Sequence, residues 1–166
     1  VAGLIPDSIT DGPGFRFTIF TQGCPHACEG CHNPETWSFK GGTWYTVDEL
    51  IKWYETSPLH QGVTFSGGEP FAQAGALIPV AKKIHDLGGD TLAFTGYTLD
   101  ELEASSNPDV HEFLKQLDYL IDGPFELATK DIGLLYRGSH NQRLLKQVDG
   151  AWQPWDGHLY PSSSTP

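Results

Sequence analysis

The sequence has few of the features that mark exported, membrane-spanning or nucleic-acid-binding proteins. Its 166 residues include no methionine, three cysteines and only 10 lysines and arginines against 21 aspartates and glutamates, giving a formal net charge of −11. Such a chain is poorly suited to neutralising phosphates or docking on an anionic membrane, so we expect no nucleic acid and no membrane among its partners. No apolar run approaches the roughly 18 residues of a spanning helix, and the N-terminus lacks the basic start and apolar core of a signal peptide. We therefore expect a cytoplasmic protein.

The length and composition indicate one folded domain. Hydrophobic residues make up 39% of the chain, which argues against wholesale disorder, and its 19 glycines and 12 prolines predict many short connections. We place the domain at residues 1–149. Residues 150–166 are rich in tryptophan, proline, glycine and serine, and we expect them to form an irregular C-terminal tail, pinned by Trp152 and Trp155.

Runs of strand-forming residues alternate with helical stretches along the chain. Capping-box patterns at Thr46 and Thr98 predict two helix starts, and Asn107 precedes a third. Residues 72–87 are helical in composition, although Pro79 should kink or split that helix. This alternation predicts βαβ units with right-handed crossovers and a mainly parallel sheet. The predicted strands are residues 15–21, 63–66, 91–95 and 119–121, with a candidate fifth strand at 134–136.

All three cysteines lie in one short loop after the predicted strand 15–21. Cys24, Cys28 and Cys31 have the spacing C-x3-C-x2-C. Three thiols within eight residues make a poor disulfide framework, so a reducing compartment and a metal site explain them better. Thiolates are soft ligands that bind iron–sulfur clusters, zinc or copper(I).

Two kinds of metal centre fit this loop. A structural zinc ion would take His26 or His32 as a fourth ligand, but such sites are usually built from two separated pairs of ligands. A 4Fe–4S cluster held by three cysteines, although four are more common, leaves one iron without a protein ligand. That iron is open to a small molecule, and the compact cysteine run favours this cluster.

A glycine-rich turn follows the next predicted strand. Gly67, Gly68 and Glu69 would lie at the same edge of the sheet as the cysteine loop, because the carboxyl ends of parallel strands meet there. The turn also has a purely structural interpretation, in which the glycines supply backbone freedom and the glutamate lies at a helix N-terminus. Alternatively, glycines let the backbone approach a ligand closely, and a carboxylate accepts hydrogen bonds from a ligand ammonium group.

The cysteine spacing and the downstream Gly-Gly-Glu-Pro together resemble the radical S-adenosylmethionine superfamily. Further motifs in the same order resemble activating proteins of glycyl-radical enzymes, and several are similar to the family that activates anaerobic ribonucleoside-triphosphate reductase. The similarity extends from Asp11 to Arg143. The motifs are Asp11-Gly12-Pro13-Gly14, Gln22-Gly23-Cys24-Pro25-His26, Cys31-His32-Asn33-Pro34-Glu35-Thr36-Trp37, Thr95-Gly96-Tyr97, Ile121-Asp122-Gly123-Pro124-Phe125 and Tyr136-Arg137-Gly138-Ser139 with Asn141-Gln142-Arg143.

The resemblance implies an α/β fold of the radical S-adenosylmethionine type, an incomplete (βα) barrel with a mainly parallel sheet and outer helices. A full eight-stranded barrel takes about 250 residues. It also implies a set of cofactor contacts, with no catalytic side chain beyond them. Cys24, Cys28 and Cys31 would bind three irons, and the fourth iron would take the amino and carboxylate groups of S-adenosylmethionine. The backbone around Gly30 and His32 would lie against the adenosyl group, and Gly67, Gly68 and Glu69 would receive the methionine amino group.

The implied activity is that of an oxidoreductase. One electron passes from the cluster to the sulfonium, the S–C5′ bond breaks, and the 5′-deoxyadenosyl radical removes a hydrogen atom from a glycine of the reductase. The implied partners are the anaerobic ribonucleoside-triphosphate reductase and a one-electron donor such as flavodoxin or ferredoxin. Alternatives are an activator of another glycyl-radical enzyme, such as pyruvate formate-lyase, and a non-catalytic zinc or electron-transfer module.

Two further motif segments have no role fixed by the resemblance. Asp122 is a candidate cofactor contact, or a residue that caps its own turn before Gly-Pro. The segment from Arg137 to Arg143 is a candidate docking or cofactor element, or the start of a helix with solvated arginines.

Overall fold

The computed structural model describes residues 3–8, 16–22, 45–56, 60–123 and 142–156, and the first of these ranges is described for its backbone alone. Within them the chain forms one seven-stranded sheet in which the strand order follows the chain order. The strands are β1 (Gly3–Ser8), β2 (Arg16–Thr21), β3 (Gly62–Gly67), β4 (Asp90–Phe94), β5 (Tyr119–Asp122), β6 (Arg143–Val148) and β7 (Ala151–Pro154). The helices are α1 (Val47–Tyr54), the 3₁₀ helix η2 (Pro70–Gln73), α2 (Ala74–Asp86), α3 (Leu99–Glu103) and α4 (Pro108–Lys115).

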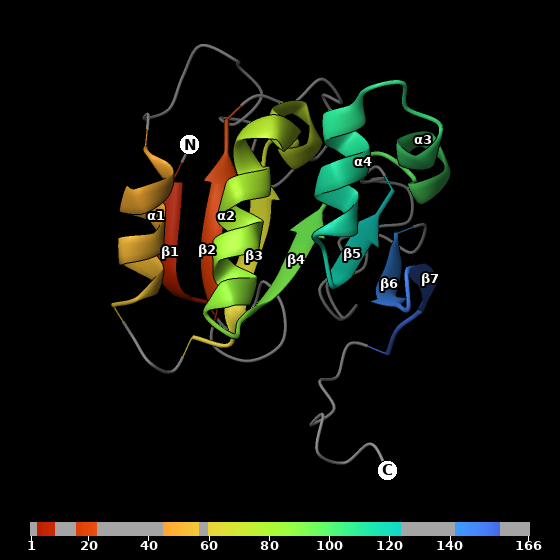
Figure 1. The fold of residues 1–166 in the computed structure, drawn as a ribbon. Helices are drawn as coiled ribbons and strands as arrows, with labels where there is room; N and C mark the ends of the chain where they lie inside the picture. The colour runs from red at the N-terminus through yellow and green to blue at the C-terminus, as the bar shows by residue number, and fades with distance from the viewer. Residues whose placement is uncertain (1–2, 9–15, 23–44, 57–59, 124–141, 157–166) are drawn as a thin grey trace.

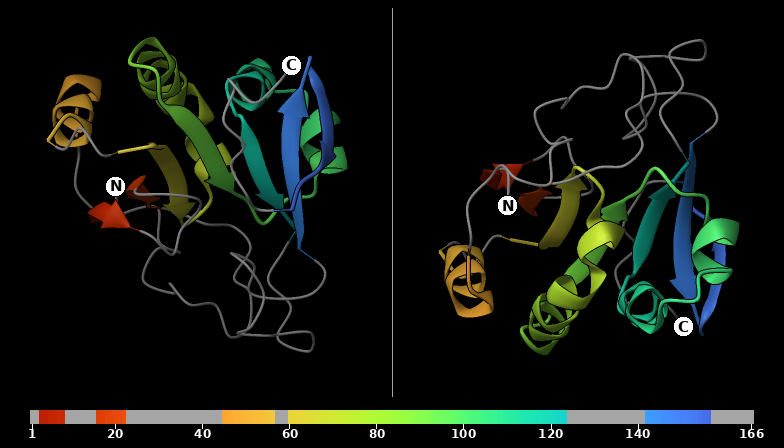
Figure 2. Two further views of the ribbon diagram at one scale, coloured as in Figure 1. Left: turned by 90° about the horizontal axis from the view of Figure 1, so that it is seen from below. Right: turned by 90° about the horizontal axis from the view of Figure 1, so that it is seen from above.

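The four central strands, β2 to β5, are parallel, whereas β1, β6 and β7 each pair antiparallel with the preceding or following strand. Helices α1, α2 and α4 cover one face of the sheet (Figure 1, Figure 2). Because every parallel crossover steps to the next strand in the same direction, right-handed connections place all of their helices on that face. With β1 and β7 at the two edges of the described sheet, this is the winding of a barrel that does not close. The predicted α/β fold with a parallel centre and outer helices is confirmed.

Most elements that carry strong local signals lie where the sequence predicts them. The four predicted strands correspond to β2, β3, β4 and β5. The side chains of Thr46 and Thr98 each cap a helix, and each is part of a reciprocal capping box. Helix α2 runs from Ala74 to Asp86 without ending at Pro79, so the expected split does not occur. The candidate strand at 134–136 lies outside the described residues.

The tail prediction needs a correction. Residues 151–154 form strand β7, which pairs with β6, so the segment after residue 150 begins with regular structure. The expected anchoring by tryptophans is confirmed, because Trp155 is buried and stacks on Tyr119 with ring centroids 4.3 Å apart, while Trp152 packs against the main core. Burial also raises the pKa of the Tyr119 hydroxyl to about 12.

The main core lies between the helices and the sheet. Phe113 of α4 is fully buried at its centre and contacts the rings of Phe65 and Phe71 at centroid distances of 5.3 and 5.0 Å. A smaller apolar cluster, which includes Leu92 and Ile121, contains Trp155. None of the helices in the described ranges is long and apolar enough to span a bilayer.

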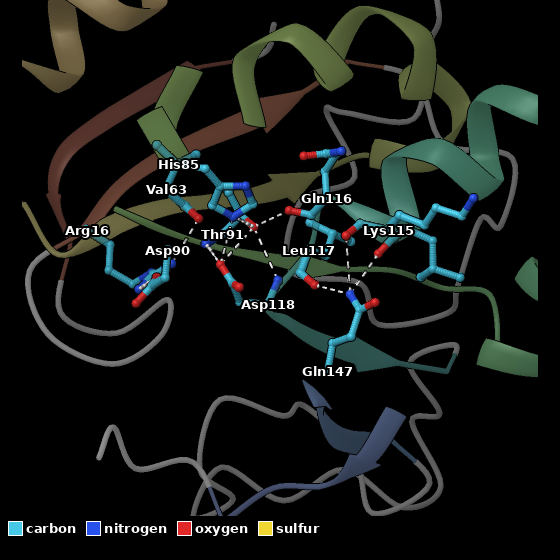
Figure 3. Close-up of polar contacts among 11 residues, drawn as sticks. Arg16, Val63, His85, Asp90, Thr91, Lys115, Gln116, Leu117, Asp118 and Gln147 are labelled. Atoms are coloured by element: carbon cyan, nitrogen blue, oxygen red, sulfur yellow. Dashed lines mark hydrogen bonds and ion pairs between the residues drawn. The ribbon is translucent and has the colours of Figure 1, made fainter. Parts of the chain in front are cut away.

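A fully buried arginine ties three strands together at the N-terminal edge of the sheet, the end at which the parallel strands begin. The guanidinium of Arg16 donates from Nε to Oγ1 of Thr64 at 2.7 Å. It also donates to the carbonyl of Val63 at 2.9 Å and pairs with Oδ1 of Asp90 at 2.6 Å (Figure 3). A Cβ on Gly62 would lie 2.1 Å from the carbonyl oxygen of Asp90, so glycine is required at that position. Burial raises the pKa of Asp90, and the positive charge of Arg16 opposes that rise.

We predict that Arg16→Met lowers the free energy of unfolding by about 3 kcal/mol, because it leaves the carboxylate of Asp90 buried without its guanidinium partner. The matched control is Lys82→Ala, which breaks an exposed pair with Glu112 at 3.8 Å. The control should cost less than about 1 kcal/mol. Urea unfolding of both variants checks this, and equal losses in the free energy of unfolding would contradict the stabilising role assigned to Arg16.

A second polar network lies at the same edge, between α2 and the start of β5. Nε2 of His85 lies 2.9 Å from Oδ2 of Asp118, which also accepts the backbone N–H of Thr91 at 2.9 Å (Figure 3). The hydroxyl of Thr91 donates to the carbonyl of Gln116 at 2.6 Å. The hydrogen bond to Asp118 raises the pKa of His85. This network therefore stabilises the fold most when the imidazole is protonated.

The raised pKa of His85 predicts a pH-dependent contribution to stability. The contribution is complete below the unfolded-state pKa of 6.5 and is lost as the pH rises through the higher pKa of the folded state. The loss in free energy of unfolding on His85→Gln should therefore be larger at pH 6 than at pH 8.5, by less than about 1 kcal/mol since water screens these half-exposed groups. Urea titrations at both pH values check this, with Lys82→Ala as the control that stays constant. A larger loss at pH 8.5 would contradict the assigned ion pair.

Candidate functional site

The carboxyl ends of β2 and β3 lie side by side and are joined by short polar contacts. Thr21 pairs in register with Gly67, and its carbonyl accepts the N–H of Gly68 at 2.8 Å. The hydroxyl of Thr21 donates to the carbonyl of Ser66 at 3.1 Å. The glycine-rich turn after β3 is thus held against the end of β2, the strand that leads into the cysteine loop.

Gly67 is required by the closeness of these two chain segments. Its φ angle is +95°, and a Cβ built on it would lie 2.6 Å from the backbone nitrogen of Thr21. The sequence left two interpretations of the glycines open, backbone freedom and a close approach to a ligand. For Gly67 the positive φ angle requires the freedom, and the group that approaches closely is the backbone of the neighbouring strand. The next helical turn adds a contact, because the side-chain amide of Gln73 donates to the backbone carbonyl of Gln22.

Glu69 is fully buried and links the loops after β3 and β4. Its Oε2 accepts the backbone N–H of Phe71 at 3.1 Å, which places the carboxylate at the N-terminus of η2 as the sequence predicts. The same oxygen accepts the hydroxyl of Thr95 at 2.8 Å, and Oε1 accepts the backbone N–H of Gly96 at 2.7 Å. A buried charge is tolerated only when such donors replace water.

A second buried carboxylate, Asp122, lies at the end of β5. Its Oδ2 accepts the N–H of Leu99 at the start of α3 at 2.8 Å, and its Oδ1 accepts Nε of Arg143 at 3.0 Å. A second guanidinium nitrogen, Nη2, completes a bidentate pair, which raises the pKa of Arg143. Among the described residues, Asp122 therefore holds the start of α3 and an arginine side chain.

The described end of the Arg137–Arg143 segment joins β6 to the rim, the end of the sheet formed by the carboxyl ends of the parallel strands and the turns that follow them. The side chain of Gln142 donates to the carbonyl of Gly123 at 3.1 Å, and the N–H of Gly123 donates to the carbonyl of Tyr97 at 2.8 Å. Arg143 begins strand β6, so no helix starts at this last residue of the segment. Arg137 lies outside the described residues.

The structure therefore brings together Gly67, Gly68 and Glu69, three of the eight site residues predicted from sequence. Their turn contacts Thr21, and the chain reaches the first cysteine three positions later. The remaining five predicted site residues lie outside the described ranges, as does His26. They are Cys24, Cys28, Gly30, Cys31 and His32.

The described residues fit the cofactors that the resemblance implies. A buried carboxylate and a glycine turn lie beside the strand that leads into three soft thiolate donors. An anionic group suits a ligand ammonium group, and the thiolates suit iron. Thr95 and Gly96 donate hydrogen bonds to Glu69 but were not among the predicted site residues. The available signals were their place in one of the motifs that carry the resemblance and their position directly after β4.

We predict that Gly67→Ala lowers the free energy of unfolding by about 3 kcal/mol, because it adds a steric clash to an unfavourable φ angle. Gly88→Ala is the matched control, since Gly88 has a φ angle of +82° but nothing within 4 Å of the added Cβ. The control should lose about 1 kcal/mol. Chemical denaturation checks both, and a loss in Gly67→Ala no larger than the control would contradict the close approach.

Comparison with known proteins assigns the chain to a family. Residues 10–145 match the family described as a 4Fe-4S single cluster domain. The chain is 38% identical over 147 residues to the anaerobic ribonucleoside-triphosphate reductase-activating protein of Pasteurella multocida, covering 82% of this chain and 90% of that protein. It is 36% identical over 160 residues to the protein of the same name from Enterobacteria phage T4, covering 90% and 96%. The Salmonella typhi protein of that name is 36% identical over 145 residues, covering 82% and 92%. The chain therefore belongs to the family of anaerobic ribonucleoside-triphosphate reductase-activating proteins and contains its 4Fe-4S single cluster domain.

Proposed function

We propose that this protein is a radical S-adenosylmethionine enzyme that cleaves S-adenosylmethionine reductively at a 4Fe–4S cluster and generates a glycyl radical on anaerobic ribonucleoside-triphosphate reductase. The observation that carries the proposal is the contact between the Gly67-Gly68-Glu69 turn and the end of β2. Family membership over more than four-fifths of the chain supports it.

The three cysteines are the proposed cluster ligands. Cys24 follows Gln22 by two residues, a separation that covalent geometry limits to about 7 Å between Cα atoms. The carbonyl of Gln22 accepts a hydrogen bond from Gln73, three residues after Pro70. The start of the cysteine loop is therefore tied to the same turn that carries Glu69. When bound, the cluster and S-adenosylmethionine together supply the radical that removes a hydrogen atom from a glycine of the reductase.

The proposed role of the turn is to bind and orient the methionine end of S-adenosylmethionine. Gly67 and Gly68 are partly exposed and present backbone at the rim, while the negative charge of Glu69 favours the ammonium group. The backbone around Gly30 and His32 is proposed to contact the adenosyl group. Such fixed positioning also limits side reactions of a strong hydrogen-abstracting radical.

The proposed partners are the reductase, as protein substrate, and a one-electron donor such as flavodoxin or ferredoxin. The two alternatives make different demands. An activator of another glycyl-radical enzyme would use the same cofactors on a different protein, whereas the similarity to a 4Fe-4S cluster domain argues against a zinc module.

The test is an anaerobic reaction of the reconstituted, reduced protein with S-adenosylmethionine, with the reductase present or absent. We expect 5′-deoxyadenosine by chromatography and an organic radical by electron paramagnetic resonance when the reductase is present. A parallel reaction with pyruvate formate-lyase should give no radical. Cleavage without any radical on the reductase would reject the proposed partner, and absence of cleavage would reject the activity.

We predict that Cys28→Ala loses cluster iron and abolishes S-adenosylmethionine cleavage, because two thiolates cannot retain the cluster. Iron analysis and 5′-deoxyadenosine formation measure this, with Lys82→Ala as a surface control that keeps both. Cleavage at a near-normal rate in Cys28→Ala would show that the ligand assignment is wrong.

A further inference from the structure

We propose that Thr95 is a positioning residue for S-adenosylmethionine binding: its hydroxyl fixes the orientation in which the buried Glu69 carboxylate meets the ammonium group of the ligand. The inference rests on the proposed function and deepens it. It assigns a role to a side chain that follows β4, whereas the predicted cofactor contacts follow β2 and β3.

The hydroxyl of Thr95 has a fixed direction. Its oxygen accepts the backbone N–H of Tyr97 at 3.1 Å, and an amide N–H can only donate. The hydroxyl proton is therefore directed at Oε2 of Glu69, 2.8 Å away. With Thr95 only 4% exposed, water does not compete readily for this proton.

The hydrogen bond from Thr95 settles the rotation of the carboxylate. The terminal torsion of a glutamate has a broad energy profile, so neighbouring donors decide its angle. The hydroxyl of Thr95 lies 2.8 Å from Oε2, closer than the N–H of Phe71 at 3.1 Å. The N–H of Gly96 donates to the other oxygen, Oε1, at 2.7 Å, so the loop after β4 donates hydrogen bonds to both oxygens of Glu69.

The backbone of this loop is anchored without the threonine side chain. The N–H of Thr95 donates to the carbonyl of Ile121 at 3.0 Å, and the carbonyl of Tyr97 accepts the N–H of Gly123 at 2.8 Å. A substitution that keeps the size of Thr95 but removes its hydroxyl therefore leaves these backbone contacts in place. It changes the orientation of Glu69 more than the path of the loop.

Thr95→Val and Thr95→Ser form the test pair, because valine keeps the shape without the hydroxyl and serine keeps the hydroxyl. The dissociation constant for S-adenosylmethionine is measured by anaerobic equilibrium dialysis on the cluster-loaded proteins, together with iron content, urea unfolding and the KM and kcat of cleavage. We expect about tenfold weaker binding for Thr95→Val, the effect of losing a hydrogen bond to a charged group. Thr95→Ser should bind within about twofold of wild type on the same reasoning. In Thr95→Val, KM should rise by more than kcat falls.

The outcomes separate this inference from the proposed function. If the wild-type protein binds S-adenosylmethionine and Thr95→Val binds it with the same affinity, the positioning role is overturned. Equally weakened binding in Thr95→Val and Thr95→Ser also overturns it, because that result would indicate packing alone. If Thr95→Val loses iron, Thr95→Ala replaces it, and the same contrast with serine is required. Failure of the wild-type protein to bind S-adenosylmethionine overturns the proposed function, and this inference falls with it.

Discussion

The buried carboxylate of Glu69 is the group on which the arrangement of the rim depends. Its side chain is buried, and its charge is stabilised by donors from two separate loops, those that follow β3 and β4. Asp122, two strands further along, is a second buried carboxylate with donors from separate segments, and it joins the start of α3 to Arg143 of β6. Because Gly68 bonds to Thr21 of β2, polar contacts run without a break from β2 to β6. The loops that would meet a cofactor are thereby held in one arrangement.

The two ends of the sheet have different tasks. At the N-terminal edge, Arg16 and Asp90 tie β2, β3 and β4 together, and His85 and Asp118 tie a helix to the start of β5. These contacts stabilise the strands and take no part in the proposed chemistry. The carboxyl edge carries the glycine turn and leads into the cysteine loop, as in barrel enzymes, where loops after the strands form the active site. Winding in one direction makes this separation possible, because every parallel strand presents its carboxyl end to the same rim.

Local signals predicted well, and long-range contacts did not show in the sequence. The capping boxes at Thr46 and Thr98 and the buried parallel strands follow from neighbouring residues. Strands β1, β6 and β7 were not predicted. They are antiparallel strands at the sides of the sheet, where pairing with a neighbouring strand decides the structure and the sequence pattern of the strand itself is weak. The bond from Thr95 to Glu69 spans 26 positions, and only the folded chain shows it. The cysteine spacing predicted the cluster through its chemistry, and the match to a 4Fe-4S cluster domain confirms that cofactor for the family.

The central claim is that the cysteine loop and the glycine turn form one site for S-adenosylmethionine beside an iron that no protein ligand occupies. The most direct measurement is the electron paramagnetic resonance spectrum of the reduced cluster, recorded anaerobically in frozen solution before and after addition of S-adenosylmethionine. Binding at the open iron predicts a shift in the g values that saturates at one ligand per cluster. Identical spectra at saturating ligand would contradict the account.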